Sequence, residues 1–150
     1  MKDEKYVLPE SGLDEFEIIE FSVGKVFYGI NVTKVREIIN LLPITVLPKT
    51  HPHIDGVFTL RGKIIPLVNL TKFFNSNIDS IHPQIIVAEM NDTFIGFKVD
   101  AVSRIYSVSQ KQVEATPEAS RAEQVIGVVK MENRLIILLD FAKILSQIAQ

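Results

Sequence analysis

The sequence of 150 residues contains no cysteine and no tryptophan. Without cysteine there is no disulfide framework and no thiolate chemistry, which suits a reducing cytoplasm. Basic residues (16) do not outnumber acidic residues (18), and the net charge of −2 argues against a nucleic-acid partner. No apolar run approaches the ~18 residues that a membrane-spanning helix needs. We therefore expect a soluble protein with no direct insertion into a membrane.

Patterns that would indicate an active site or a metal site are also missing. The serines show no histidine partner pattern, and no glycine-rich phosphate loop is present. His51 and His53 form a close pair, but zinc usually takes three or four protein ligands and His82 is far away in sequence. We predict no catalytic residue, no metal and no cofactor.

Short segments of period-two alternation dominate the sequence, in which apolar residues make up 47%. In the first segment, Phe16 and Ile18 lie on one face, and Ile19 and Phe21 lie on the other. A two-residue hairpin loop follows at Gly24-Lys25, with glycine first as a type II′ turn prefers. The alternation therefore predicts a β-hairpin.

The apolar period changes after the returning strand of this hairpin. Val32, Val35 and Ile38 are spaced by three residues, and Thr33 is a suitable capping residue. We predict one or two helical turns there. A short strand is expected at residues 45–47.

Residues 59–70 predict a second hairpin around the turn at Arg61 and Gly62. Gly62 can take the positive φ that such a turn needs. Pro66 donates no ladder hydrogen bond, so its strand is expected to be an edge strand or to carry a bulge. Arg61 has two interpretations, a solvated turn residue or an arginine held at a recognition surface.

The second half of the chain repeats the pattern of the first half. A shift of 67 residues places Gly29 on Gly96, and a shift of 71 residues places Gly56 on Gly127. Further matches pair Phe27 with Phe94, Thr33 with Asp100, Val35 with Val102, Ile38 with Ile105, Gly62 with Asn133, and Lys63 with Arg134. We expect the second copy to repeat the helical turn, with Asp100 as its cap.

The repeat predicts an all-β domain at residues 15–150, preceded by a flexible tail at residues 1–14. The two β units span about residues 16–75 and 83–146, with about five strands each, and short evenly spaced strands favour small barrels. Asp140 is expected to cap a short final helix whose apolar stripe closes a barrel. That stripe consists of Phe141, Ile144, Leu145 and Ile148.

The two copies differ in charge at two matched positions. The first copy has Glu37 where the second has Arg104, and it has Arg61 where the second has Glu132. Opposite charges at matched places are what a protein needs if its two ends meet different surfaces.

Three segments carry a resemblance to a known family. Residues 21–24, residues 28–32 together with 35–38, and residues 60–67 resemble the CheW family of chemotaxis coupling proteins, and the likeness extends from about Glu15 to Ile148. Residues 34–39, 51–53 and 88–91 most resemble the N-terminal coupling half of CheV, in which a receiver follows. No receiver follows here, so both a shortened CheV and a stand-alone coupler remain open.

The resemblance implies two intertwined five-stranded SH3-like barrels with a shared hydrophobic junction, and no catalysis. It also implies a cytoplasmic adaptor, recruited to membrane receptor arrays. Its partners would be the regulatory domain of the histidine kinase CheA and the cytoplasmic tips of chemoreceptors. The alternative is a generic SH3-like barrel module that binds peptides and has no role in chemotaxis.

The resemblance also implies roles for single residues. Kinase binding falls on Val35, Glu37 and Ile38; coupling falls on Gly56, Arg61 and Gly62; receptor binding falls on Val102 and Ile105. Core packing remains the alternative for the valines and Ile105, a solvated helix end for Glu37, and a plain turn residue for Gly62.

Overall fold

The computed structural model describes residues 15–48, 51–74, 76–116 and 123–148. The first repeat comprises β1 (Glu15–Val23), β2 (Val26–Asn31), η1 (Val32–Lys34), β3 (Val35–Asn40), β4 (Ile54–Leu60), β5 (Lys63–Asn69) and α1 (Thr71–Phe74). The second comprises β6 (Gln84–Met90), β7 (Thr93–Val99), β8 (Ala101–Ser109), η2 (Gln110–Gln112), β9 (Val125–Met131), β10 (Arg134–Leu139) and α2 (Phe141–Ile148). The tail predicted at residues 1–14 lies outside the described residues.

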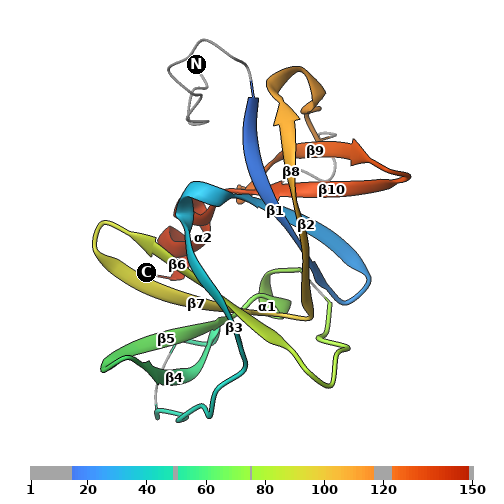
Figure 1. Cartoon of the computed structure of the whole chain (residues 1–150). Helices are drawn as coiled ribbons and strands as arrows, with labels where there is room; N and C mark the ends of the chain where they lie inside the picture. The colour runs from blue at the N-terminus through green and yellow to red at the C-terminus, as the bar shows by residue number, and fades with distance from the viewer. Residues whose placement is uncertain (1–14, 49–50, 75, 117–122, 149–150) are drawn as a thin grey trace.

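The strands form two five-stranded sheets, each of which curls into a barrel (Figure 1). Barrel A has the strand order β8-β1-β2-β10-β9, and barrel B has the order β3-β6-β7-β5-β4. Each barrel thus takes strands from both repeats, because β8 pairs with β1 and β3 pairs with β6. The all-β fold of two intertwined barrels is confirmed.

The internal duplication is confirmed by the strand pairings. The parallel pair β10·β2 of barrel A corresponds to the parallel pair β5·β7 of barrel B. Isolated bridges join Thr45 to Val57 of β4 and Glu114 to Val128 of β9, so a residue outside the strands pairs with each of these matched strands. Of the strand expected at residues 45–47, only Thr45 takes part in β pairing.

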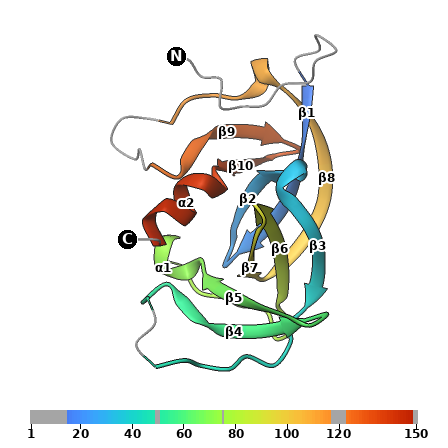
Figure 2. The ribbon, with the colours of Figure 1, turned by 90° about the vertical axis from the view of Figure 1, so that its left-hand side faces the viewer.

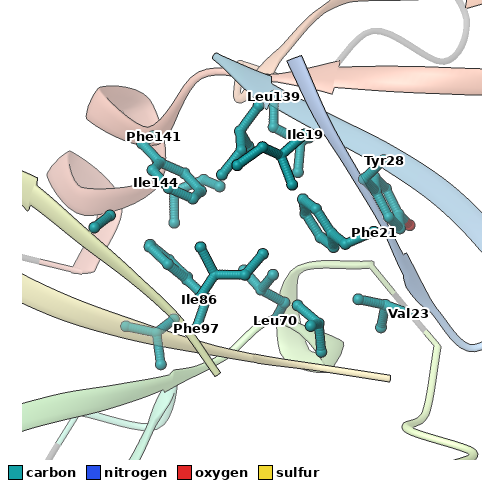
Figure 3. Packing of buried hydrophobic residues seen from close by; sticks show 14 residues of the cluster. Ile19, Phe21, Val23, Tyr28, Leu70, Ile86, Phe97, Leu139, Phe141 and Ile144 are labelled. Atoms are coloured by element: carbon teal, nitrogen blue, oxygen red, sulfur yellow. The ribbon is translucent and has the colours of Figure 1, made fainter. Parts of the chain in front are cut away.

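A shared hydrophobic cluster fills the junction between the barrels (Figure 3). Ile19 and Phe21 of β1 enter this junction cluster, whereas Phe16 and Ile18 point into barrel A. The two predicted faces of the first strand are therefore confirmed, and both are buried because a barrel interior lies on one side and the junction on the other.

The final helix packs on the junction instead of closing a barrel. Phe141 stacks on Phe97 of β7 with ring centroids 4.2 Å apart, and Ile144 is fully buried in the junction cluster. Asp140 caps the helix as predicted, since its Oδ1 accepts the backbone N–H of Ala142 at 2.9 Å. Figure 3 shows Phe141 and Ile144 entering the cluster from α2.

The predicted helical turn after the first hairpin is mostly wrong. Only the 3₁₀ turn η1 is helical, and its cap is Asn31, whose side chain accepts the N–H of Thr33. The following residues form β3, where a bulge between Val35 and Glu37 shifts the register. Because a bulge inserts one extra residue, Val35 and Ile38 fall on the same face of a strand and imitate helical spacing.

The second copy contains the same bulge and no helical turn after β7. The register of β8 against β1 shifts between Arg104 and Val102, so Val102 and Ile105 also share a face. Asp100 precedes a strand and not a helix, so the predicted cap at Asp100 is wrong. Glu37 is likewise a strand residue, which removes its interpretation as a solvated helix end.

The expectation for Pro66 is also wrong, because β5 lies between β7 and β4 and no bulge occurs at the proline. Pro66 lies opposite Val57, whose N–H and C=O both bond to Thr45 on the outer side. The ladder with β7 begins only at Leu67. A proline fits this inner strand because its position requires no N–H donor.

Candidate functional site

Four apolar residues of β3 and β8 border the junction cluster at matched positions. Val35 and Val102 pack against the cluster and are half-buried. Ile38 and Ile105 lie opposite cluster residues and are 37% and 55% exposed. Figure 2 shows β3 and β8 on the side of the molecule away from α1 and α2. We call these four residues the junction face, and it unites apolar positions that the resemblance assigns to two different partners.

The edge strands of barrel B are β3 and β4, and we call the place where the sheet closes between them the seam of the barrel. An ion pair between Glu37 and Arg61 lies at this seam. Glu37 extends from β3, the first strand of the sheet, and accepts a hydrogen bond from Arg61 in the turn between β4 and β5. This hydrogen bond and the charge of Glu37 raise the pKa of the Arg61 guanidinium above its usual value. The Arg61 side chain is 69% exposed, and that of Glu37 is 30% exposed. Both charges are therefore available to a partner.

The seam of barrel A has the same ion pair with its polarity inverted. Arg104 extends from β8, and its Nη1 lies 3.4 Å from Oε2 of Glu132 in the turn between β9 and β10. Both side chains are more than half exposed. Alignment of the two repeats within the sequence detected the four charged residues but did not predict that they form ion pairs. The available signal was that both members of a pair change sign together.

A cation also lies over an aromatic ring in each barrel. In barrel B, Nζ of Lys63 is 4.6 Å from the ring centroid of Phe94. In barrel A, the guanidinium of Arg134 is 4.0 Å from the ring centroid of Phe27. Barrel B adds Arg36, which pairs with Glu89 at 3.2 Å. Sequence reasoning matched Lys63 with Arg134 but did not predict these contacts.

Sequence reasoning missed a buried carboxylate in barrel A. Glu20 is fully buried, and its Oε2 lies 3.1 Å from Nη1 of Arg134. The equivalent position in barrel B holds the buried Val87. The pKa of the nearby Tyr106 phenol is raised, mainly by burial and to a smaller extent by the negative charge of Glu20. Glu20 lies on the same face of the predicted strand as Phe16 and Ile18, and this was the only sign in the sequence that it is buried.

The two glycines assigned to coupling shape the backbone that carries Arg61. A Cβ on Gly56 would lie 2.3 Å from the carbonyl oxygen of Thr45, so a side chain there would push the Thr45–Val57 bridge away. Gly62 has φ of 82° in the turn beside Arg61, as predicted. Gly62 therefore helps to place Arg61, and Gly56 makes room for the segment that pairs with β4.

The histidine pair takes part in ring stacking. The rings of His51 and His53 are 4.9 Å apart, and His53 stacks on Phe73 at 4.2 Å. Within the described ranges, no group of three or more His, Cys, Asp or Glu residues is placed to hold a metal ion. None of the helices in the described part of the chain has the length and apolar character needed to cross a membrane.

Comparison with known proteins identifies the family. The family model described as CheW-like domain matches residues 17–149. The chain belongs to the CheW family. The chemotaxis protein CheW of Thermotoga maritima is 35% identical over 138 residues, which cover 91% of each chain. The chemotaxis protein CheV3 of Helicobacter pylori is 34% identical, and the match covers 91% of this chain but 49% of CheV3.

A solved structure agrees with this result. The scaffolding protein TtCheW from Thermoanaerobacter tengcongensis superposes with a TM-score of 0.77 at 28% identity, covering 93% of this chain and 90% of TtCheW. Family, fold and relatives together make this chain a chemotaxis coupling adaptor with a CheW-like domain.

Proposed function

We propose that this CheW-family adaptor bridges the histidine kinase CheA and the cytoplasmic tips of chemoreceptors without catalysing a reaction. The kinase would bind through its regulatory domain. The adaptor would act in the cytoplasm, recruited to membrane receptor arrays. Membership of the CheW family supports this proposal, and the arrangement of charges on the two barrels supports its division between two partners.

The kinase surface lies on barrel B, at Val35, Glu37 and Ile38. The observation that carries this assignment is the Glu37–Arg61 ion pair, which holds an exposed cation and a partly exposed anion at the barrel seam. Charge-assisted hydrogen bonds fix orientation and partner choice at an interface. Ile38 supplies an exposed apolar contact on the same strand.

The coupling residues act by placing that pair. Gly56 leaves room for the Thr45 bridge, and Gly62 forms the turn that presents Arg61. Arg61 itself contacts Glu37 of the kinase surface. Its replacement by alanine should reduce receptor control of the kinase more than it reduces either binary affinity.

The receptor surface lies on β8, at Val102 and Ile105. Ile105 is 55% exposed, and Val102 anchors the strand to the junction cluster. An exposed apolar side chain supported by a packed neighbour is a suitable docking point for an apolar partner surface. The counterparts in barrel B, Val35 and Ile38, lie on the same junction face.

Glu37→Lys tests the kinase surface, and Arg104→Glu is its matched control at the equivalent position of barrel A. Calorimetric titration with the isolated kinase regulatory domain should show an affinity loss of roughly tenfold or more for Glu37→Lys, as for a hot-spot residue. Arg104→Glu should keep the wild-type affinity. Circular dichroism of both variants checks that the fold survives.

Ile105→Ser tests the receptor surface. It should keep the kinase affinity and lose receptor binding, measured by co-sedimentation with membranes that contain receptors. Kinase binding left intact by Glu37→Lys would overturn the kinase assignment. Equal loss of both partners in Ile105→Ser would overturn the division between barrels, and no kinase binding by the wild-type chain would overturn the proposed function.

A further inference from the structure

Two crossovers carry the chain between the barrels. The first runs from β2 of barrel A through η1 to β3 of barrel B, and the second runs from β7 of barrel B through Asp100 to β8 of barrel A. Both lead directly into strands that carry the junction face. The geometry at the crossovers therefore bears on how Val35 and Ile38 are placed relative to Val102 and Ile105.

The second crossover is tied to two other segments by one buried carboxylate. Asp100 is 5% exposed, and its Oδ2 accepts the backbone N–H of Gly24 in the β1–β2 turn at 2.5 Å. Its Oδ1 accepts the N–H groups of Asp79 and Ser80, at 2.5 and 2.6 Å, in the connector between the repeats. The Asp100 N–H donates to the carbonyl of Ser22 at 2.9 Å.

The first crossover is held in a different way. Thr33, the equivalent of Asp100, donates through its N–H and its hydroxyl to the side chain of Asn31, two residues away. These bonds shape η1 locally, whereas those of Asp100 join a barrel A hairpin to the connector that enters barrel B. The duplication has thus kept the crossover and changed what anchors it.

The difference matters because the junction cluster is apolar. Hydrophobic contacts are non-directional, so an apolar junction specifies the orientation of two barrels less sharply than hydrogen bonds do. Hydrogen bonds to a carboxylate are directional and about twice as strong as neutral ones. We propose that Asp100 is a positioning residue that fixes the orientation of barrel A relative to barrel B. Its effect on receptor binding rests on the function proposed above, and its effect on barrel orientation does not.

The orientation can be measured directly, because the chain has no cysteine that would take up a label elsewhere. Thr59 on β4 and Lys130 on β9 are exposed and occupy matched positions of the two barrels. Spin labels on Thr59→Cys and Lys130→Cys report one distance between the barrels by pulsed electron paramagnetic resonance. Asp100→Asn replaces one carboxylate oxygen with an amide that faces N–H donors, so it should shift or broaden this distance distribution.

Asp140→Asn is the matched control. Asp140 also accepts backbone N–H groups, but those groups belong to the first turn of its own helix. Its substitution should lower the melting temperature and leave the distance distribution unchanged. Asp79→Pro removes one donor to Asp100 and leaves the carboxylate, so it should produce a smaller change in the same distance even if Asp100→Asn does not fold.

A functional measurement completes the test. Asp100→Asn should lower receptor binding, because Asp100 directly precedes β8, the strand that carries the receptor surface. The affinity for the kinase regulatory domain should stay at the wild-type value, because the kinase surface lies on the other barrel and is reached through the first crossover. Distance distributions that superimpose for wild type, Asp79→Pro and any folded Asp100→Asn protein would overturn the positioning role. An altered distance with unchanged receptor binding would keep that role and overturn its link to the proposed function.

Discussion

Glu37 and Arg104 occupy equivalent positions of the two repeats, carry opposite charges, and each forms an ion pair with the turn residue of its own barrel. Their partners are Arg61 and Glu132. Both residues of the pair change the sign of their charge between the two barrels, so each seam still holds one positive and one negative side chain. The duplication has preserved a structural contact while giving the two barrel ends different charge patterns.

This relationship separates the structural role of the seam from its role in recognition. Arg61→Glu places two carboxylates at the seam of barrel B and should lower the melting temperature slightly, as for an exposed pair. Adding Glu37→Arg restores an ion pair with the polarity of barrel A, so the melting temperature should recover. Kinase binding, measured by titration calorimetry, should not recover. Recovery of both would mean that the seam acts only on stability.

The apolar residues of α2 should contribute unequally to the free energy of unfolding. Ile144→Ala should cost roughly 2–5 kcal/mol, from lost apolar burial plus the cavity left in the junction cluster. Leu145→Ala should cost less, because Leu145 is only half-buried. Urea denaturation measures both free energies. Equal costs would show that the helix does not pack on the junction as described.

In the ion pair of Glu20 and Arg134 in barrel A, removal of the arginine should lower the free energy of unfolding far more than removal of the glutamate. Arg134→Ala leaves the fully buried Glu20 carboxylate without its cation and should cost roughly 3 kcal/mol. Glu20→Val instead copies Val87 of barrel B, and Arg134 keeps Phe27 and solvent, so the change should lie within about 1 kcal/mol of wild type. Urea denaturation measures both costs, and a larger loss of unfolding free energy for Glu20→Val than for Arg134→Ala would contradict this prediction.

Burial of Tyr28 predicts a loss of stability at high pH. Burial raises the pKa of this phenol to about 12, from 10.0. The folded state thus favours the neutral phenol; its contribution is complete below pH 10 and is lost as the pH rises to about 12. The loss is at most about 2–3 kcal/mol. Tyr28→Phe removes this dependence, so the stability difference between wild type and variant should change above pH 10.

Much of the fold was predictable because period-two alternation and two-residue turns are local signals. The hairpin turn at Gly24 and the repeat of its strands in the second half followed from such signals. The helical turn at Val32–Ile38 was wrong because a bulge adds one residue to a strand and imitates helical spacing. A spacing rule cannot distinguish the two without knowing that β6 lies opposite β3.

The candidate site was predictable in part. The charge differences at Glu37 and Arg61 were visible once the repeats were aligned. Their pairing was not, because it depends on the curl of a sheet whose neighbouring strands come from the other repeat. The buried Glu20 and the anchoring role of Asp100 depend on three-dimensional neighbours far away in sequence, and no local pattern reports them.

The exchange of strands between repeats has a consequence for a repeat taken alone. A single repeat provides β1 and β2 to one barrel and β3, β4 and β5 to the other, so it completes neither. A single repeat made on its own could bury its apolar faces only against a second copy of itself, as a symmetric pair of chains. Joining the two repeats in one chain removes that symmetry, so each half can carry its own charges, which a symmetric dimer cannot do.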